Sequence, residues 1–240
     1  MKRIIITSGD ARVGKSTMSK LLLDLYLSEG LVVYAAYNGH RNKLEAYQKK
    51  MDIHKFNLER GDYDEFIGKL DSSGEIDVVL MDMPGQVLPE FIKFERDTCL
   101  FEGLYSIGYR VVFLNPISYR QDCMYYVKEL FHEFKASADY VIVKNECFGK
   151  KFPYFDVDIQ SSVKSFDGAI MQLPSLSKFA YYRLEEVGCI YSDGALKKPD
   201  EAISKKLGVV ERSLIFNWLN KFKRNIYSDK KLIEYFGLAV

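Results

Sequence analysis

Residues 9–17, Gly-Asp-Ala-Arg-Val-Gly-Lys-Ser-Thr, give the strongest indication of how this 240-residue chain folds. They match the pattern G-x-x-x-x-G-K-[ST] and lie between an apolar run at Arg3–Thr7 and a helical stretch that begins at Lys15. Glycines at the two ends of the pattern let the backbone curve round a phosphate with its amides turned inward. The start of the helix adds a partial positive charge. The stretch therefore predicts a phosphate-binding loop between a strand and a helix.

Each residue type in this loop has an expected role. Lys15 would bridge the β- and γ-phosphates of a nucleotide, and the Ser16 hydroxyl would ligate Mg²⁺. Thr17 is placed to bond the α-phosphate. The predicted nucleotide-binding residues of the loop are Gly9, Asp10, Ala11, Arg12, Val13, Gly14, Lys15, Ser16 and Thr17.

A second element ends in an acidic residue. The apolar run Val78–Met81 is followed by Asp82, Met83, Pro84 and Gly85. An aspartate at the carboxyl end of a buried strand can hold Mg²⁺, usually through water. Gly85 would supply a flexible amide that senses the γ-phosphate. Ser16 and Asp82 are thus the expected magnesium residues, with Mg²⁺ as cofactor and a nucleoside triphosphate as ligand.

Short apolar runs alternate with helical stretches along the chain, which predicts an α/β fold. We expect a mostly parallel sheet with helices on both faces, in three α/β/α layers, followed by C-terminal helices. The predicted strands are Arg3–Thr7, Leu31–Tyr37, Ile76–Asp82, Arg110–Asn115, Tyr140–Lys144 and Gly168–Leu173. The predicted helices include Lys15–Ser28, Arg41–Lys50, Tyr63–Leu70, Pro89–Tyr105, Arg120–Ser137, Val157–Phe166, Ser175–Val187 and Glu211–Asn225, and Cys189–Pro199 is expected to be a loop. Residues 1–188 would form the nucleotide-binding domain, and 189–240 a helical extension on the same domain.

Composition narrows the class of partner. Lysine and arginine number 34 and aspartate and glutamate 33, so no overall field favours nucleic acid or acidic lipid. The four cysteines are scattered, which favours reduced thiols over a zinc site or disulfides. The apolar run near the N-terminus is too short for a signal peptide, and no stretch approaches the ~20 apolar residues of a membrane span. We therefore expect a cytoplasmic protein.

Taken together, four features resemble the MinD/ParA group of P-loop ATPases, which includes plasmid partition, stability and conjugation proteins of StbB and TraL type. They are the loop at 9–17, the Asp82 turn, the strand that ends at Asn145, and Leu173-Pro174 after the last strand. The resemblance implies an ATP-binding switch that forms an ATP-dependent homodimer, works with a protein partner and in some members binds DNA nonspecifically. It also implies that Asn145 reads the adenine and that Pro174 flanks the base.

The chain departs from the group's pattern at two positions. Asp10 stands where the group commonly has a lysine that reaches across a dimer, and Arg12 could partly compensate by sensing phosphate. Asn38 follows the second strand, where the group has an aspartate-rich turn; an amide can orient a water but cannot act as a carboxylate base. The catalytic candidates are therefore Lys15 and Asp82, joined by Asn38 and Arg12, and we expect slow or partner-stimulated hydrolysis.

Other interpretations stay open at this stage. A P-loop also suits a small-molecule kinase or ligase, such as a nucleotide kinase or a dethiobiotin-synthetase-like enzyme, and a non-hydrolysing nucleotide sensor. The basic, amphipathic tail Lys230–Leu238 resembles the membrane tail of MinD-type ATPases. Glu234 weakens that interpretation, and a tail that docks on its own domain is commoner; the tail lysines could also form a modest DNA-binding patch.

Overall fold

The computed structural model describes residues 1–196 and 198–239. Seven strands form one sheet in the order β3-β2-β4-β1-β5-β6-β7, and every pairing is parallel. The strands are β1 (Lys2–Thr7), β2 (Val33–Tyr37), β3 (Ile53–Lys55), β4 (Val78–Asp82), β5 (Tyr109–Ile117), β6 (Asp139–Asn145) and β7 (Ala169–Leu173). The predicted α/β/α fold is confirmed, and the sheet is wholly rather than mostly parallel.

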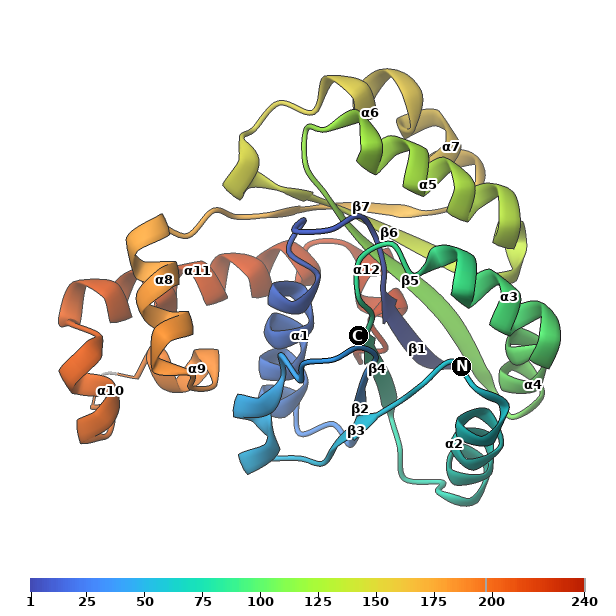
Figure 1. The fold of residues 1–240 in the computed structure, drawn as a ribbon. Coiled ribbons are helices and arrows are strands. Elements are labelled where there is room, and N and C mark those ends of the chain that lie inside the picture. The colour runs from blue at the N-terminus through green and yellow to red at the C-terminus, as the bar shows by residue number, and fades with distance from the viewer. Residues whose placement is uncertain (197, 240) are drawn as a thin grey trace.

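Helices cover both faces of the sheet (Figure 1). One face carries α2 (Arg60–Ser72), α3 (Leu88–Thr98), α4 (Leu100–Ser106), α5 (Gln121–Phe134), α6 (Pro153–Asp158) and α7 (Gln160–Ser165). The other carries α1 (Lys15–Glu29), α8 (Lys178–Val187), α9 (Tyr191–Gly194), α10 (Glu201–Lys206), α11 (Val209–Tyr227) and α12 (Lys230–Tyr235). Short 3-10 turns are η1 (Glu45–Lys49), η2 (Lys135–Ser137) and η3 (Glu146–Phe148).

The central strand β1 shows why the middle layer is so apolar. Ile4 and Ile6 face the cluster under α2–α7, whereas Ile5 faces the cluster under α1 and α8–α12. All three side chains are at most 1% exposed. A strand that is buried on both faces needs an unbroken apolar run, because successive side chains point to opposite sides.

The structure differs from the predicted elements at five places. The three-residue strand β3 was missed, and the helix expected at Arg41–Lys50 is only the 3-10 turn η1. The helix expected at Pro89–Tyr105 breaks at Cys99, whose φ of 51° is left-handed. The helix expected at Val157–Phe166 is two short helices, α6 and α7, and the loop expected at Cys189–Pro199 contains α9.

The C-terminal tail docks on the sheet instead of standing free. Leu232, Ile233, Tyr235 and Phe236 are at most 6% exposed and belong to the cluster that contains α1. The Tyr26 hydroxyl of α1 donates a hydrogen bond of 2.9 Å to the Phe236 carbonyl. A membrane contact through these apolar side chains would require α12 to leave the core. We propose that residues 189–240 complete the same folding unit as residues 1–188.

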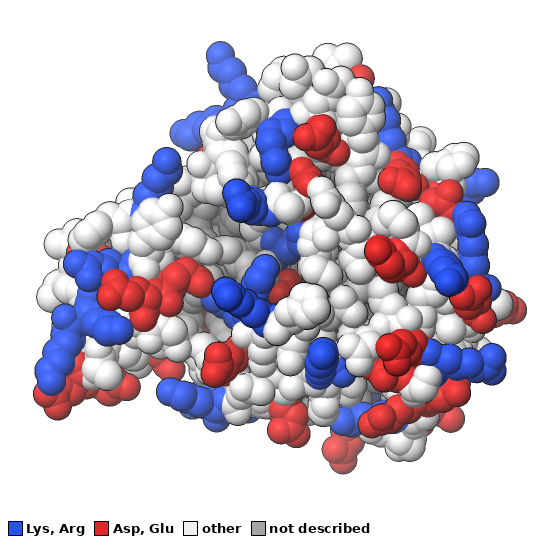
Figure 2. All heavy atoms as spheres, in the orientation of Figure 1, with Lys and Arg blue, Asp and Glu red and all other residues white. Residues whose placement is uncertain are grey.

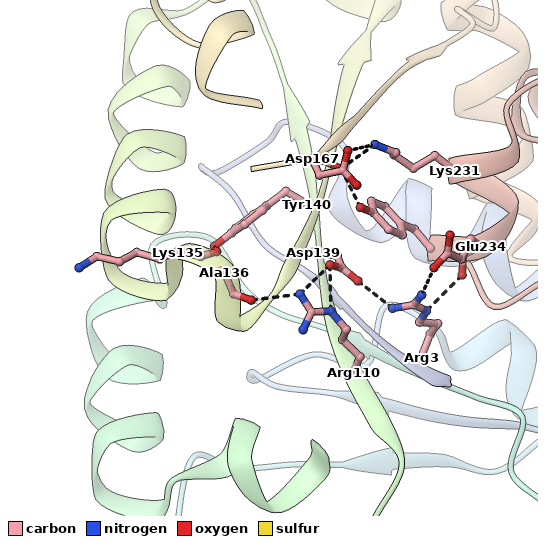
Figure 3. A network of polar contacts seen from close by, with 10 residues as sticks. Arg3, Arg110, Lys135, Ala136, Asp139, Tyr140, Asp167, Lys231 and Glu234 are labelled. Carbon is pink, nitrogen blue, oxygen red and sulfur yellow. Dashed lines mark hydrogen bonds and ion pairs between the residues drawn. The ribbon is translucent and has the colours of Figure 1, made fainter. Parts of the chain in front are cut away.

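Charged residues fasten the tail at the amino-terminal edge of the sheet (Figure 3). Arg3 of β1 contacts Asp139 of β6 and Glu234 of α12, at 2.7 Å in each case. Arg110 of β5 bonds the second oxygen of Asp139 at 2.8 Å, and this hydrogen bond raises the pKa of the Arg110 guanidinium. Lys231 contacts Asp167 beside the same edge. Within the described residues, no helix is long and apolar enough to cross a membrane.

Candidate nucleotide-binding site

The loop between β1 and α1 has, at its two glycines, the left-handed backbone conformation that glycine allows. Gly9 and Gly14 have φ values of 128° and 103°, which L side chains rarely adopt. Both also lie against neighbours that leave no room for a side chain. A Cβ on Gly14 would come within 2.6 Å of the Asn145 amide nitrogen, and one on Gly9 within 3.2 Å of the Asn115 side-chain oxygen. The loop is therefore closely supported by the ends of β5 and β6.

Lys15 is turned back into the loop. Its ammonium group donates hydrogen bonds to the Gly9 carbonyl at 3.1 Å and the Asp10 carbonyl at 2.6 Å. Burial lowers the pKa of Lys15 to about 8, although the nearby Asp82 carboxylate opposes that shift. Two carbonyl oxygens are weak partners for a buried cation compared with anionic oxygens. The arrangement leaves Lys15 ready to exchange them for phosphate oxygens.

Asp82 lies at the carboxyl end of β4, next to the start of α1. Its Oδ2 accepts a hydrogen bond from the Ser16 hydroxyl at 2.8 Å, and its Oδ1 accepts one from Thr7 and one from Ser19, both at 3.0 Å. The residue is 5% exposed. Thr7 and Ser19 thus hold the Asp82 carboxylate in place, and the sequence pattern did not single them out.

The donor atoms of this corner fit Mg²⁺. In the part of the chain that the structure describes, no group of three or more His, Cys, Asp or Glu side chains is arranged to hold a metal ion. Mg²⁺ prefers oxygen ligands and is usually held by one or two protein oxygens together with waters and phosphate oxygens. Ser16 and Asp82 supply a hydroxyl and a carboxylate within hydrogen-bond distance of each other, which fits that requirement.

Asn145, at the carboxyl end of β6, is hydrogen-bonded to the predicted phosphate-binding loop. Its Nδ2 donates to the Val13 carbonyl at 2.9 Å, and its Oδ1 accepts from the Cys147 amide at 3.2 Å. The residue is 4% exposed. Sequence reasoning gave Asn145 the task of reading a base, and this loop-supporting role was missed. Base recognition by Asn145 stays a prediction.

A cleft of about 370 Å³ opens beside the loop and the first turn of α1. Its walls include Arg12, Lys15, Thr17 and Lys20 from the loop and α1, and Lys43 from the segment after β2. Figure 2 shows Lys and Arg side chains round a hollow between α8 and the start of α1. Amides at a helix start and several cations along one cleft make a binding site for a polyanion.

One wall of this cleft comes from α8. The Tyr181 hydroxyl lies 2.8 Å from the Thr17 hydroxyl, and Glu185 pairs with Lys20 at 2.8 Å. A bound α-phosphate would share or take the hydrogen bond of Thr17. Pro174, before α8, is fixed by its carbonyl, which accepts a hydrogen bond of 2.6 Å from the Trp218 indole. Its predicted place beside the base stays a prediction.

The Asp82 turn approaches the other end of the loop. Gly85 lies so close to Ala11 that a Cβ on Gly85 would come within 2.9 Å of the Ala11 Cα. Asn38 is nearby through its main chain, since its amide donates to the Asp82 carbonyl at 3.0 Å. Its side chain, however, donates to the Phe56 carbonyl at 2.8 Å and joins β2 to the segment after β3. This bond occupies one N–H of the amide, and the water-orienting role of Asn38 stays a prediction.

A larger hollow of about 830 Å³ lies elsewhere, between α1, α9 and α11. Its walls are mostly apolar and include Leu21, Leu25 and Phe216. None of the predicted phosphate-binding residues reaches it. We expect the nucleotide in the smaller cleft, because that cleft contains the loop residues Gly14, Lys15, Ser16 and Thr17.

Solved structures of other proteins share this fold. The sequence matches no protein-family model and no curated protein. Among solved structures, the MinD cell division protein of Aquifex aeolicus is similar over 93% of this chain and 98% of its own, with a TM-score of 0.52 and 11% identity. The fold is that of MinD. A complex of MinC with MinD from the same organism gives the same TM-score over 93% of this chain and 96% of that one, at 11% identity.

A nucleotide-binding protein from Archaeoglobus fulgidus, solved with ADP, is similar to 79% of this chain and 87% of its own length. Its TM-score is 0.51 and its identity 15%. Identities this low show a shared architecture and do not carry an activity from one protein to the other. Function has to be argued from the loop, the cations and the Asp82 corner.

Proposed function

We propose that this protein binds ATP together with Mg²⁺ and acts as a nucleotide-dependent switch. One observation carries the proposal: Lys15, Ser16 and Asp82 meet at the start of α1, beside a cleft lined with cations. Lys15 would stabilise the charge of the β- and γ-phosphates. When bound, Mg²⁺ offsets the charge of the phosphate oxygens beside Ser16 and Asp82.

The switch would act through the segments that touch the terminal-phosphate end of the loop. Gly85 lies against Ala11, and the segment that starts at Asn38 is hydrogen-bonded to the Asp82 carbonyl. A terminal phosphate would draw these two segments together, and its loss would release them. The MinC complex of the similar MinD structure supports a protein partner, and an ATP-dependent homodimer is the second form that we propose.

Slow or partner-stimulated hydrolysis is the activity that we propose. Asn38 carries an amide, which is hydrogen-bonded to the Phe56 carbonyl and cannot act as a carboxylate base. We propose a role in plasmid partition, stability or conjugation on the strength of the sequence resemblance alone. The same engaged Asn38 favours the alternative of a nucleotide sensor that does not hydrolyse.

Titration calorimetry with Mg²⁺–ATP tests the proposal. Lys15→Ala should weaken binding by about 100-fold or more, because the variant loses the ammonium group that faces the phosphates. Lys221→Ala, which removes an exposed lysine of α11, is the matched control and should bind like the unaltered protein. Equal affinity in both variants would refute the assignment of the loop.

Three further measurements test the activity and the dimer. Phosphate release from ATP, alone and with candidate partners or DNA, distinguishes an ATPase from a sensor. Transfer of the phosphate to an added small molecule would instead identify a kinase or ligase. Light scattering with and without ATP would show whether a dimer forms.

A further inference from the structure

Asp10 places a carboxylate inside the loop where the triphosphate is proposed to bind. Its side chain is 10% exposed, and its Oδ1 accepts a hydrogen bond of 2.6 Å from the Ala11 amide. That amide is one of the donors that a phosphate-binding loop offers to its ligand. A carboxylate within about 5 Å of a phosphate in a half-buried site weakens anion binding by about 10- to 100-fold unless a cation compensates it.

The compensating cation in this structure is Arg120, which directly precedes α5. Its Nη2 contacts the Asp10 Oδ2 at 2.7 Å and donates to the Ala11 carbonyl at 2.8 Å. Its Nε donates to the Ser118 hydroxyl at 3.2 Å, and Ser118 is 1% exposed. The guanidinium is thus held from both sides, by a buried hydroxyl and by the loop itself. Sequence reasoning missed this residue, although it follows the carboxyl end of β5.

The Asp10–Arg120 pair lies at one particular end of the site. Ala11, which contacts both members of the pair, also packs against Gly85 of the Asp82 turn. The nucleoside end of the cleft is expected at the opposite side, where Thr17 meets Tyr181. The charge of Asp10 therefore acts mainly on a terminal phosphate and little on the phosphates nearer the sugar.

We propose that Arg120 is a positioning residue that neutralises Asp10 and thereby allows the loop to accept a terminal phosphate. The inference rests on the proposed function and adds to it a source of preference for triphosphates. Arg120 stays with Asp10 in this account and does not itself bind the nucleotide. Removing both charges should then be less harmful than removing the arginine alone.

A double-mutant cycle on the full chain tests this pairing. Calorimetry would compare a non-hydrolysable ATP analogue and ADP, each with Mg²⁺, for Arg120→Ala, Asp10→Asn and the double variant. Arg120→Ala should weaken binding of the analogue by about 10- to 100-fold and binding of ADP by less than about threefold, because only the analogue carries a γ-phosphate. The double variant should recover to within about threefold of Asp10→Asn. Arg120→Lys should retain most of the affinity, since it restores a cation.

Arg60→Ala, at an arginine whose side chain is 81% exposed on α2, is the control for a lost surface charge. An unchanged affinity in Arg120→Ala would overturn the inference. So would equal losses for both nucleotides, which indicate a merely distorted loop, or a double variant as weak as Arg120→Ala, which indicates a direct contact with phosphate. If neither the unaltered protein nor any variant binds a triphosphate, the proposed function fails and the inference fails with it.

Discussion

Charged side chains are buried at both ends of the parallel strands, and the two ends satisfy those charges in different ways. The amino-terminal edge of the sheet is the one where the strands begin, and the carboxyl-terminal edge is the one where they end. At the amino-terminal edge, Arg3 and Arg110 are paired with Asp139 and Glu234, so two cations face two anions. At the carboxyl-terminal edge, Lys15 bonds main-chain carbonyls and Asp82 bonds three hydroxyls. Each of these ions at the first edge has a counter-ion, whereas Lys15 and Asp82 have no ionic partner at hydrogen-bond distance among the described residues.

This difference separates stability from binding. A buried ion that already has its counter-ion gains nothing from a ligand, and losing the partner leaves an expensive unpaired charge. A buried ion that is held only by neutral groups can gain a stronger partner from outside. We therefore expect charge-removing substitutions at the amino-terminal edge to reduce stability, and those at the other edge to reduce nucleotide binding.

The largest expected effect is that of Asp139→Ala. It leaves Arg3, whose side chain is 6% exposed, without its buried counter-ion, and should cost about 3 kcal/mol or more of unfolding free energy. Urea unfolding measures this cost, with Asp71→Ala at an exposed position of α2 as the control. Nucleotide affinity of the folded variant should not change. A fall in affinity without a fall in stability would reverse the comparison.

At the other edge, Asp82→Asn should remove most of the advantage that Mg²⁺ gives to ATP binding. We expect the ratio of affinities measured in Mg²⁺ and in a chelator to fall by about 100-fold, because an amide replaces the carboxylate that holds the ion. Stability should change less than in Asp139→Ala, since the three hydroxyls can turn to suit an amide. An unchanged Mg²⁺ ratio would remove Asp82 from the proposed metal site.

The sequence predicted the fold well because the deciding signals are local. A glycine-rich loop between an apolar run and a helix, and an aspartate at the end of another apolar run, are readable in consecutive residues. The same signals indicated Lys15, Ser16 and Asp82, which the structure brings together.

Other parts of the site could not be predicted in the same way. Arg120 contacts Asp10 and Tyr181 contacts Thr17, although the members of each pair are more than a hundred residues apart in the sequence. Such contacts depend on which strands become neighbours, and no local pattern encodes them. Asn38 shows the converse case: its position in the chain suggested a catalytic role, while its amide is engaged with the Phe56 carbonyl.

A third prediction concerns the proton on Lys15. The pKa of Lys15 is about 8 in the free protein, against an ordinary lysine value of 10.5. Its amine is therefore mostly neutral at pH 9. Phosphates at the amine would raise this pKa, so binding at pH 9 should take up about 0.5 to 1 proton. Calorimetry in buffers of different ionisation enthalpy measures the uptake. Lys15→Arg, whose side chain stays charged, should show none, and equal uptake in both proteins would place the titrating group elsewhere.

The smallest expected effect is that of Glu234→Gln, and it is the sharpest comparison with Asp139. Both carboxylates lie 2.7 Å from the same guanidinium of Arg3, but the Glu234 side chain is 65% exposed and that of Asp139 is 11% exposed. Water already screens the exposed pair, so its loss should cost at most about 0.5 kcal/mol. The docking of α12 would then rest on its buried apolar residues. If Glu234→Gln were as destabilising as Asp139→Ala in the same urea experiment, burial would not explain the difference between the two carboxylates, and the charge itself would be what fastens the tail.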